Sequence, residues 1–471
     1  MTARRSFRKV RRVIHRENDG VSWQLEADFA PLLEALLKSA GQVVKESPVK
    51  QVTRHQLGGK TFYVKRYLHH AVALRPLKFF LKHSQARQEW VLAQELEARG
   101  VPIVRHLALG ERRTWRGVQE SILVTEAFDG VPVGRLPGVD PGAVLQFVQQ
   151  MHDRGVVQHD LHPGNLLARH EPFELRLVDL HGIRVQPQVS PEDRRKNLAL
   201  LRVFVPIPVP AEVERDSRRL RRTLLYRRSK RCLLRNREFA RQRLGGLTWQ
   251  LRLSLANDAV RRVLEDPDGF LTGRAQVLKP GRTSTVGLAD GLVLKRFNFR
   301  KIENVVKDLL RPSRARRAFR AAYHLELAGI ATARPIALAV QRAAGILLRS
   351  YLLMEEIVGG IDLGAYLRRS GLQMALVEQG ARLIAQLHQE GFSHRDLKET
   401  NLVVDREGGL YLIDLDGLKF LGQVSARRAA LDLRRLARAT AGYAAVTAQH
   451  RRLFLLTYCR ARRLRKVPRV V

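Results

Sequence analysis

The sequence predicts an α+β fold in two tandem units, each with a sheet-rich lobe followed by a helical lobe. Three observations lead to this prediction. The chain of 471 residues is long for one domain and comfortable for two. Strand-like runs, helical runs and polar loops follow one another in the same order twice. Two similar polar strings, QHDLHPGN at 158–165 and HRDLKETN at 394–401, stand at the same point of each half.

The spacing between the halves is nearly constant, which is why we interpret them as a repeat. Asp160 and Asp396 are 236 residues apart (396 − 160), and the asparagines that close the two strings are separated equally. Each string is followed by an apolar run that ends in another aspartate, in LRLVDLHG and in LYLIDLDG. The offset of these later aspartates is 235 (414 − 179). A chance match would not hold its register over this length.

An Asp, an Asn and a further Asp after a short buried strand are the groups that phosphoryl transfer from ATP requires. One carboxylate orients the attacking hydroxyl and accepts its proton, while the amide and the other carboxylate hold Mg²⁺ against the phosphates. Oxygen ligands suit this hard cation. The candidate residues are Asp160, Asn165 and Asp179 in the first half and Asp396, Asn401 and Asp414 in the second.

The elements before each string also correspond. The strand-like runs TFYVKRY and GLVLKRF each place one lysine, Lys65 or Lys295, before an Arg and an aromatic residue, and we expect both lysines to contact nucleotide phosphates. Helical runs at 86–102 and 315–331 follow, each with a glycine as its stop signal. Apolar strands at 121–130 and 350–360 then end in acidic residues and glycine, and we interpret them as hinges between lobes.

An arginine-rich segment at 214–243 marks the boundary, because its RRTLLYRR is similar to FLLTYCRAR near the chain end. We interpret both as the last helix of a unit, which predicts domains at 1–235 and 236–471. As a block, this segment, with Arg218, Arg219, Arg221 and Arg222, is a candidate anion-binding surface.

Composition narrows the function classes. The chain is 45% hydrophobic and 27% charged, which is typical of a globular protein, and its net charge of +39 implies an anionic partner. Cys232 and Cys459 are far apart and lack a zinc-ligand pattern, so we expect a reducing cytoplasm. The basic N-terminus has no apolar run behind it, and no apolar run reaches membrane-spanning length.

The motifs SHRDLKETNLVV and LYLIDLDG resemble the lipopolysaccharide kinase family, which has a protein-kinase-like fold and phosphorylates heptose or Kdo sugars of the lipopolysaccharide inner core. LKPGRTSTV, LVLKRFN, SRARRAFRAA, GIATARPIAL and YLLMEEIVGGIDL also resemble its N-terminal lobe, in order. The resemblance covers nearly all of 270–440. The first half is similar but looser, and its VVQHDLHPGNLL also resembles small-molecule kinases.

The resemblance implies a role for each matching residue. It makes Asp396 and Asp160 the catalytic bases, and it assigns Lys295 and Lys65 to the phosphates. Gly281, in the turn KPGRTS, would contact the nucleotide, and Glu89 would pair with Lys65. The Mg²⁺ ligands would be Asn401 and Asp414 in the second half and Asn165 and Asp179 in the first.

The two halves depart from the family pattern in different ways. The first has Gln158 and Asn197 where the second has His394 and Asp432, and it has no glycine turn. The second has Ala318 at the position of Glu89, so we expect Lys295 to lack an ion-pair partner or to use another acid such as Glu303. Both halves keep the Asp, Asn, Asp and Lys. We expect the second half to be the working site.

These observations favour an ATP- and Mg²⁺-dependent kinase that phosphorylates a lipid-linked sugar of the lipopolysaccharide core. It would lie in the cytoplasm, peripheral to the inner membrane, with anionic lipid and other core-assembly enzymes as partners. One alternative is a protein Ser/Thr kinase, although GLKFLGQVSARRAALDL after Asp414 has no APE-like segment. Another is a scaffold with an inactive half. Nucleic acid is not expected, since no zinc, RNP or basic-zipper pattern occurs.

Overall fold

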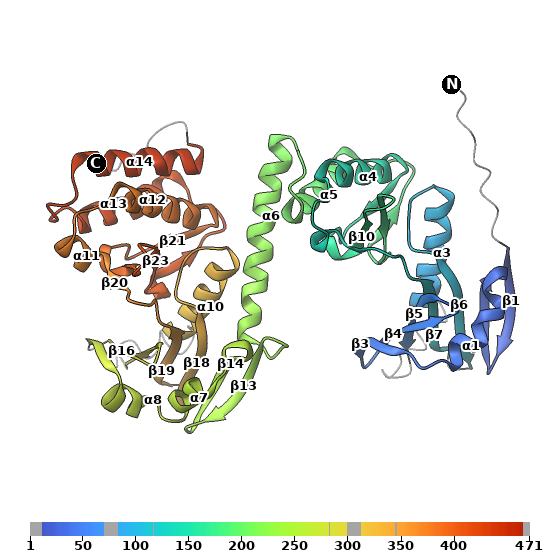
Figure 1. The fold of residues 1–471 in the computed structure, drawn as a ribbon, viewed down its shortest axis with the longest axis horizontal. Helices are drawn as coiled ribbons and strands as arrows, with labels where there is room; N and C mark the ends of the chain where they lie inside the picture. The colour runs from blue at the N-terminus through green and yellow to red at the C-terminus, as the bar shows by residue number, and fades with distance from the viewer. Residues whose placement is uncertain are drawn as a thin grey trace. The chain divides into compact units, whose positions relative to one another are not determined.

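The computed structural model describes residues 12–69, 83–115, 117–281, 283–298, 312–343 and 346–464. It divides into two compact units, residues 1–220 and 221–471. The division falls within helix α6 (Ala211–Ser229), before the predicted boundary at residue 235 (Figure 1). The reason lies in the packing: Leu225, Cys232 and Leu233 belong to the core of the second unit.

The sheet-rich lobe of the first unit is a seven-stranded antiparallel sheet with the order β1-β2-β6-β7-β5-β4-β3. Its strands are β1 (Val13–Asn18), β2 (Val21–Glu26), β3 (Gln42–Ser47), β4 (Lys50–Leu57), β5 (Lys60–Leu68), β6 (His106–Thr114) and β7 (Gly117–Glu126). Between β2 and β3 the chain forms the 3₁₀ turn η1 (Ala27–Leu32) and helix α1 (Leu33–Lys38). Helix α3 (Gln85–Ala98) follows β5.

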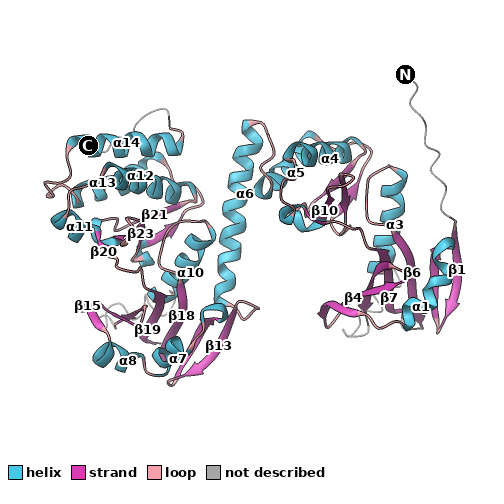
Figure 2. Cartoon of the chain, viewed as in Figure 1, coloured by secondary structure: helices cyan, strands magenta, loops and turns pink. Residues whose placement is uncertain are grey.

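The sheet of the second unit has the same order, β13-β14-β18-β19-β17-β16-β15. Figure 2 draws its strands in magenta, with β13, β15, β18 and β19 labelled. Its strands are β13 (Phe239–Leu244), β14 (Leu247–Arg252), β15 (Gln276–Pro280), β16 (Ser284–Ala289), β17 (Leu292–Phe297), β18 (Pro335–Ala343) and β19 (Ile346–Glu355). Short helical elements join β14 to β15, namely η5 (Leu253–Leu255), α7 (Asp258–Glu265), α8 (Pro267–Gly269) and η6 (Phe270–Arg274). Helix α10 (Arg314–Leu327) corresponds to α3.

The repeat begins earlier in each unit than the sequence analysis indicates. The hairpins β1–β2 and β13–β14 occupy the same edge of the two sheets, and their second strands read VSWQLE and LTWQLR. In each unit the tryptophan of this strand, Trp23 or Trp249, is fully buried. Each also faces the equivalent neighbouring strand, since Trp23 is opposite Gly110 and Trp249 is opposite Ala339.

Capping residues fix both ends of the helices that follow the lysine strands. Ser84 and Ser313 each accept a hydrogen bond from the backbone three residues on, which starts α3 and α10. Gly100 and Gly329 follow the helix ends with φ of 76° and 72°, a left-handed conformation that glycine adopts without a Cβ clash. The glycine stops predicted from the sequence are therefore present.

The helical lobes contain short strand pairs between helices. In the first unit these elements are β8 (Val131–Pro132), η2 (Val133–Arg135), α4 (Pro141–Asp153), β9 (Val156–Gln158), η3 (Pro163–Asn165), β10 (Leu166–Arg169), β11 (Glu174–Leu177), β12 (Ile183–Val185) and α5 (Pro191–Phe204). In the second they are β20 (Ile361–Asp362), α11 (Leu363–Arg369), α12 (Met374–Gln389), β21 (Phe392–His394), η8 (Glu399–Asn401), β22 (Leu402–Val404), β23 (Leu410–Leu412), η9 (Leu415–Gly417), β24 (Leu418–Phe420), α13 (Ala426–Ala439) and α14 (Ala448–Arg462). Among the helices of the described ranges, none is long and apolar enough to span a membrane.

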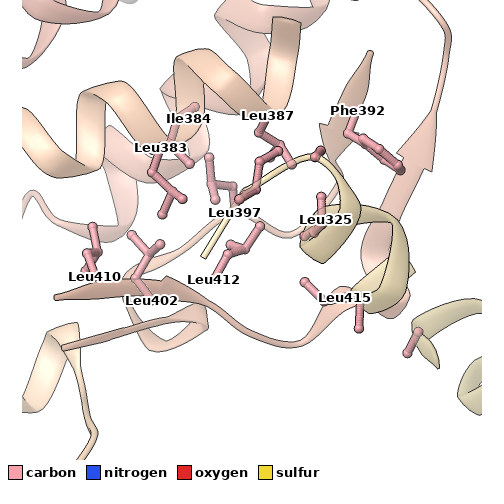
Figure 3. Packing of buried hydrophobic residues seen from close by; sticks show 14 of the residues in the cluster. Leu325, Leu383, Ile384, Leu387, Phe392, Leu397, Leu402, Leu410, Leu412 and Leu415 are labelled. Carbon is pink, nitrogen blue, oxygen red and sulfur yellow. The ribbon is translucent and has the colours of Figure 1, made fainter. Parts of the chain in front are cut away.

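The main core of the second unit connects its two lobes. Leucines of α12, β22 and β23 pack together with Leu325 of α10 and with Leu397 and Leu415 of the two loops between the short strands (Figure 3). Leu412 is fully buried in this cluster. The polar loops therefore rest directly on the apolar core, so their positions are fixed by packing.

We expect Leu412→Ala to destabilise the second unit by about 2–5 kcal/mol, because it removes three buried carbons and leaves a cavity under both loops. Leu456→Ala is the matched control, since Leu456 lies on α14 with half of its surface exposed. It should change stability by less than about 0.5 kcal/mol. Denaturant unfolding followed by hydrogen exchange of peptides from the second unit measures both, and equal effects would contradict the packing described above.

Candidate active sites of the two units

The loop after β21 in the second unit presents Asp396 at the surface and ties it to Asn401. The side-chain amide of Asn401 donates a hydrogen bond to the backbone oxygen of Asp396 at 2.7 Å. Asn401 is buried, whereas the side chain of Asp396 is 62% exposed. Because the Asn401 nitrogen is used in this bond, its amide oxygen stays available to a cation, as a Mg²⁺ ligand requires.

Asp414 lies on the second loop, directly after β23, and meets the lysine of the sheet. Lys295 Nζ on β17 is 2.5 Å from Asp414 Oδ1. Asp414 has a left-handed backbone with φ of 56°, which Asp adopts more readily than most residues. Burial would raise the pKa of this carboxyl, but the charge of Lys295 outweighs this effect and holds the pKa well below its usual range. The carboxylate is therefore ionised, as a metal ligand must be.

The first unit repeats this loop geometry. The amide of Asn165 donates to the backbone oxygen of Asp160 at 2.9 Å, and the side chain of Asp160 is 67% exposed. Asp179 follows β11 and accepts a hydrogen bond from the backbone of His181 at 3.0 Å. The structure thus places the Asp, Asn and Asp of each predicted set on the same two loops.

The lysine of the first unit has a different partner. Lys65 Nζ on β5 is 2.5 Å from Glu89 Oε1 on α3, where the resemblance places it. Tyr67 donates a hydrogen bond to Glu89 at 3.3 Å, and His106 Nε2 lies 3.6 Å away. Burial would raise the pKa of Glu89, but Lys65 and His106 hold it far below the usual value, so the acid stays ionised.

Sequence reasoning did not identify a second lysine near this pair. Lys50, at the start of β4, has its ammonium 4.9 Å from the centre of the Tyr67 ring. Burial is the main reason that its pKa is lowered, followed by the charge of Lys65. In the sheet Lys50 faces Tyr67 as Ser284 faces Phe297, so the strand register was the signal that could have identified it.

The second unit lacks the acid of Glu89, as the sequence shows, and a different contact is present. Ala318 is buried on α10. Arg314, one turn earlier, donates from Nε to Asp416 Oδ2 at 2.5 Å. Glu303, the substitute acid considered from the sequence, lies outside the described residues. Lys295 instead contacts Asp414, and no local sequence pattern indicates this contact because the two residues are 119 positions apart.

The glycine turn of the second unit is fixed at its base. The carbonyl of Gly281 accepts a hydrogen bond from the side chain of Asn298 at 3.1 Å, and Asn298 comes directly after β17. The turn is therefore tied to the strand that carries Lys295. In the first unit the corresponding turn is Ser47 to Lys50, where the Ser47 hydroxyl accepts from the Lys50 backbone at 3.1 Å.

In the two units, different side chains form the hydrogen bonds that hold the loop with Asp396 or Asp160. In the second unit the backbone of Asp396 donates to His394 Nδ1 at 3.2 Å, and Asp432 accepts from the backbone of His394 at 3.0 Å. In the first unit the backbone of Asp160 donates to Gln158 Oε1 at 3.1 Å, and the Asn197 amide donates to the backbone oxygen of Gln158 at 2.6 Å.

The side chain of Gln158 also donates to the backbone oxygen of Asp179 at 2.9 Å. Gln158 thus accepts from the backbone of Asp160 as His394 accepts from the backbone of Asp396. Asn197 contacts the backbone oxygen of Gln158, whereas Asp432 contacts the backbone N–H of His394.

Comparison with known proteins gives a family match in both units. The model of the lipopolysaccharide kinase (Kdo/WaaP) family matches residues 34–223 and 280–458, more than half of the chain. The lipopolysaccharide core heptose(I) kinase WaaP of Pseudomonas aeruginosa is 28% identical over 244 residues, which are 46% of this chain and 87% of that protein.

Two further relatives match over shorter stretches. The core heptose(II) kinase WaaY of Escherichia coli is 33% identical over 89 residues, or 18% of this chain and 38% of that protein. The 3-deoxy-D-manno-octulosonic acid kinase of Vibrio cholerae is 33% identical over 93 residues, or 20% and 39%. These two matches span well under half of the relatives' length.

Two solved structures are also similar. WaaP in complex with acyl carrier protein has a TM-score of 0.31 at 26% identity and covers 44% of this chain and 92% of that chain. The bifunctional kinase-methyltransferase WbdD has a TM-score of 0.27 at 15% identity and covers 39% and 44%.

The imidazole of His394 predicts a pH effect confined to the second unit. Burial lowers its pKa, against the smaller opposing effect of Asp414, Asp396 and Asp432. The folded protein therefore keeps this ring neutral, and its contribution to stability is present above the unfolded pKa of about 6.5 and is lost as the pH falls.

We expect His394→Gln to fold with the contacts of Gln158 and to reduce this loss by up to about 1.4 kcal/mol per pH unit. Hydrogen exchange of peptides around β21 between pH 5 and 7.5 measures it. His394→Ala, which removes the acceptor for the Asp396 backbone, should destabilise the loop at every pH. An unchanged pH slope in His394→Gln would contradict the prediction.

Proposed function

Since the chain belongs to the lipopolysaccharide kinase (Kdo/WaaP) family, we propose that it transfers a phosphate from ATP to a hydroxyl group of a heptose or Kdo sugar in the lipopolysaccharide inner core. The second unit is the working site in this proposal. Asp396 accepts the proton of the sugar hydroxyl, and Lys295 binds the phosphates. Asn401 and Asp414 would hold Mg²⁺, which would supply neutralisation of the charge that develops on the transferred phosphoryl group.

The observation that carries this proposal is the chain of contacts through the four residues of the second unit. Lys295 contacts Asp414, and the Asn401 amide contacts the backbone of Asp396. The backbone N–H of Ile413, next to Asp414, donates to the backbone oxygen of Asn401 at 2.9 Å. The base, the metal ligands and the phosphate-binding lysine therefore belong to one connected site, as phosphoryl transfer requires.

The segment after Asp414 favours a sugar over a peptide as acceptor. Only η9, β24 and a short loop separate Asp414 from helix α13, which begins at Ala426. Protein kinases use a longer segment at this point to bind the peptide substrate. A protein Ser/Thr kinase is therefore the less favoured alternative.

A cavity in the helical lobe of the second unit supports a lipid-linked acceptor. Its volume is about 700 Å³, and its walls come from α11, α12, α13 and α14. Leucine is the commonest residue of the lining, but Arg438 and Arg451 also belong to it, and both are exposed. Apolar walls with neighbouring arginines suit a hydrocarbon chain with an anionic head group. We propose that the protein works at the cytoplasmic face of the inner membrane.

The α6 arginines are less suited to membrane binding than the sequence indicates, because the fold uses them. Arg218 pairs with Glu214, Arg221 pairs with Glu390, and Arg222 donates to the backbone oxygen of Gln389 at 3.0 Å. Substituting them would disturb packing as well as charge. Exposed arginines around the cavity are therefore the better probes.

We expect Asp396→Asn to lower kcat for sugar phosphorylation by about 10²- to 10⁴-fold, because it removes the proton acceptor without changing side-chain size. Asp160→Asn is the matched variant of the first unit and should leave the rate nearly unchanged. Radiolabelled phosphate transfer to core lipopolysaccharide measures both, with nucleotide binding as the test of folding. Loss of activity in Asp160→Asn with normal Asp396→Asn would reverse the assignment of the working unit.

Vesicle binding should depend on the arginines around the cavity. We expect Arg438→Gln and Arg451→Gln together to weaken binding to anionic vesicles at least tenfold, at about 1 kcal/mol per basic residue. Arg→Lys changes at the same positions keep the charge and should bind normally. Sedimentation at low and high salt gives the measurement. Equal binding to neutral vesicles, or binding that salt does not weaken, would refute the membrane proposal while leaving the kinase assignment intact.

A further inference from the structure

Helix α10 of the second unit lacks the acid that links α3 to the lysine strand in the first. Alignment of the two helices with an offset of 229 puts Ala318 at the position of Glu89 (318 − 229). Ala318 is 3% exposed and belongs to the main core, so its side chain is committed to packing. The Lys65–Glu89 ion pair therefore has no counterpart on α10 in the described part of the second unit.

The first turn of α10 carries a different ionic contact. Arg314 Nε is 2.5 Å from Asp416 Oδ2, and the two side chains are only 25% and 12% exposed. The guanidinium carbon of Arg314 also lies 5.0 Å from the centre of the Phe297 ring. Phe297 is two residues after Lys295 on β17. Arg314 thus contacts both the metal-binding loop and the strand that carries the lysine.

Asp416 connects this contact to the predicted metal ligand. It is two residues after Asp414, on the same loop that follows β23. Asp414 in turn contacts Lys295 at 2.5 Å. Two ion pairs therefore meet on this one loop, Arg314–Asp416 from α10 and Lys295–Asp414 from β17. Moving α10 would therefore move the loop that presents Asp414.

The first unit has neither member of the Arg314–Asp416 pair. The same offsets place Gln85 at the position of Arg314 (314 − 229) and His181 at the position of Asp416 (416 − 235). Among the described residues, each unit thus shows one ionic link of this kind between its helix and its candidate nucleotide site. The link goes to the lysine in the first unit and to the metal-binding loop in the second.

We propose that the Arg314–Asp416 ion pair is a positioning device of the second unit, which holds α10 and the metal-binding loop in the nucleotide-binding arrangement in place of a lysine–glutamate pair. The inference rests on the proposed function only in taking the second unit as the site of Mg²⁺ and nucleotide. Arg314 and Asp416 are positioning residues, because they act through Asp414 and Lys295.

The test is Mg²⁺-dependent ADP binding to the full-length chain, measured by calorimetry without any sugar acceptor. Because the first unit retains Lys65 and could also bind nucleotide, the measurements use a Lys65→Met background. Arg314→Gln should weaken binding at least tenfold and raise the Mg²⁺ concentration needed for half-saturation. Arg316→Gln is the matched control, two residues further on the same helix and exposed, and should change binding less than twofold.

Rescue separates positioning from general stability. Arg314→Lys should recover most of the binding. Ala318→Glu, added to Arg314→Gln, should recover binding by supplying the acid that Glu89 provides in the first unit. A purely structural Arg314 would not respond to a new carboxylate at position 318. If Ala318→Glu does not fold, a double-mutant cycle of Arg314→Gln and Asp416→Asn replaces it, and the double variant should bind no more weakly than either single one.

The outcomes distinguish this inference from the proposed function. Unchanged Mg²⁺ dependence in Arg314→Gln, or additive losses in the cycle, would overturn the positioning role even if the wild type phosphorylates sugar. If Arg314→Gln weakens Mg·ADP binding but the wild type phosphorylates no sugar, the positioning role is supported and the proposal that a sugar is the acceptor is refuted. If the chain that carries only Lys65→Met binds no Mg·ADP, both the positioning role of Arg314 and the proposed function of the second unit are wrong.

Discussion

The charge of one nearly buried lysine in each sheet governs the organisation of both sites. Lys65 and Lys295 have only 13% and 12% of their side-chain surface exposed, so an ammonium at either position needs an acid in direct contact. In the first unit the acid comes from helix α3, and in the second it comes from the loop that follows β23. The remaining ionic contacts follow from that choice: Tyr67 and His106 surround Glu89, while Asp416 and Arg314 support Asp414.

Much of the architecture could be predicted from the sequence, because repetition is visible in a single chain. The constant offset of the two polar strings predicted two units of the same fold, and the family match confirms the resemblance on which the kinase-like fold was predicted. The hairpins with Trp23 and Trp249 were missed, since VSWQLE and LTWQLR are short and carry no chemistry. The structure divides the chain within α6, before the predicted boundary at residue 235, and Cys232 packs in the core of the second unit.

The candidate sites were predictable only in part, for a physical reason. Residues on one loop, such as Asp396 and Asn401, are close in sequence, and their spacing determines their contact. The contacts of Lys295 with Asp414 and of Arg314 with Asp416 join segments about a hundred residues apart, so no local pattern encodes them. The residues beneath the loops show that different side chains can make the same contact. Gln158 accepts a hydrogen bond from the backbone of Asp160, as His394 does from the backbone of Asp396.

The left-handed backbone of Asp414 has an evolutionary consequence. At φ of 56° the loop tolerates asparagine and glycine nearly as well as aspartate, whereas most other side chains would strain it. Asn also differs from Asp by a single nucleotide change in the codon. The backbone would therefore accept asparagine at this position, but the change would leave the nearly buried ammonium of Lys295 without its acid. In the first unit Lys65 pairs with Glu89, so loss of the Asp179 carboxylate would leave that lysine paired. The choice of ion-pair partner thus makes the second loop of the first unit freer to change than that of the second.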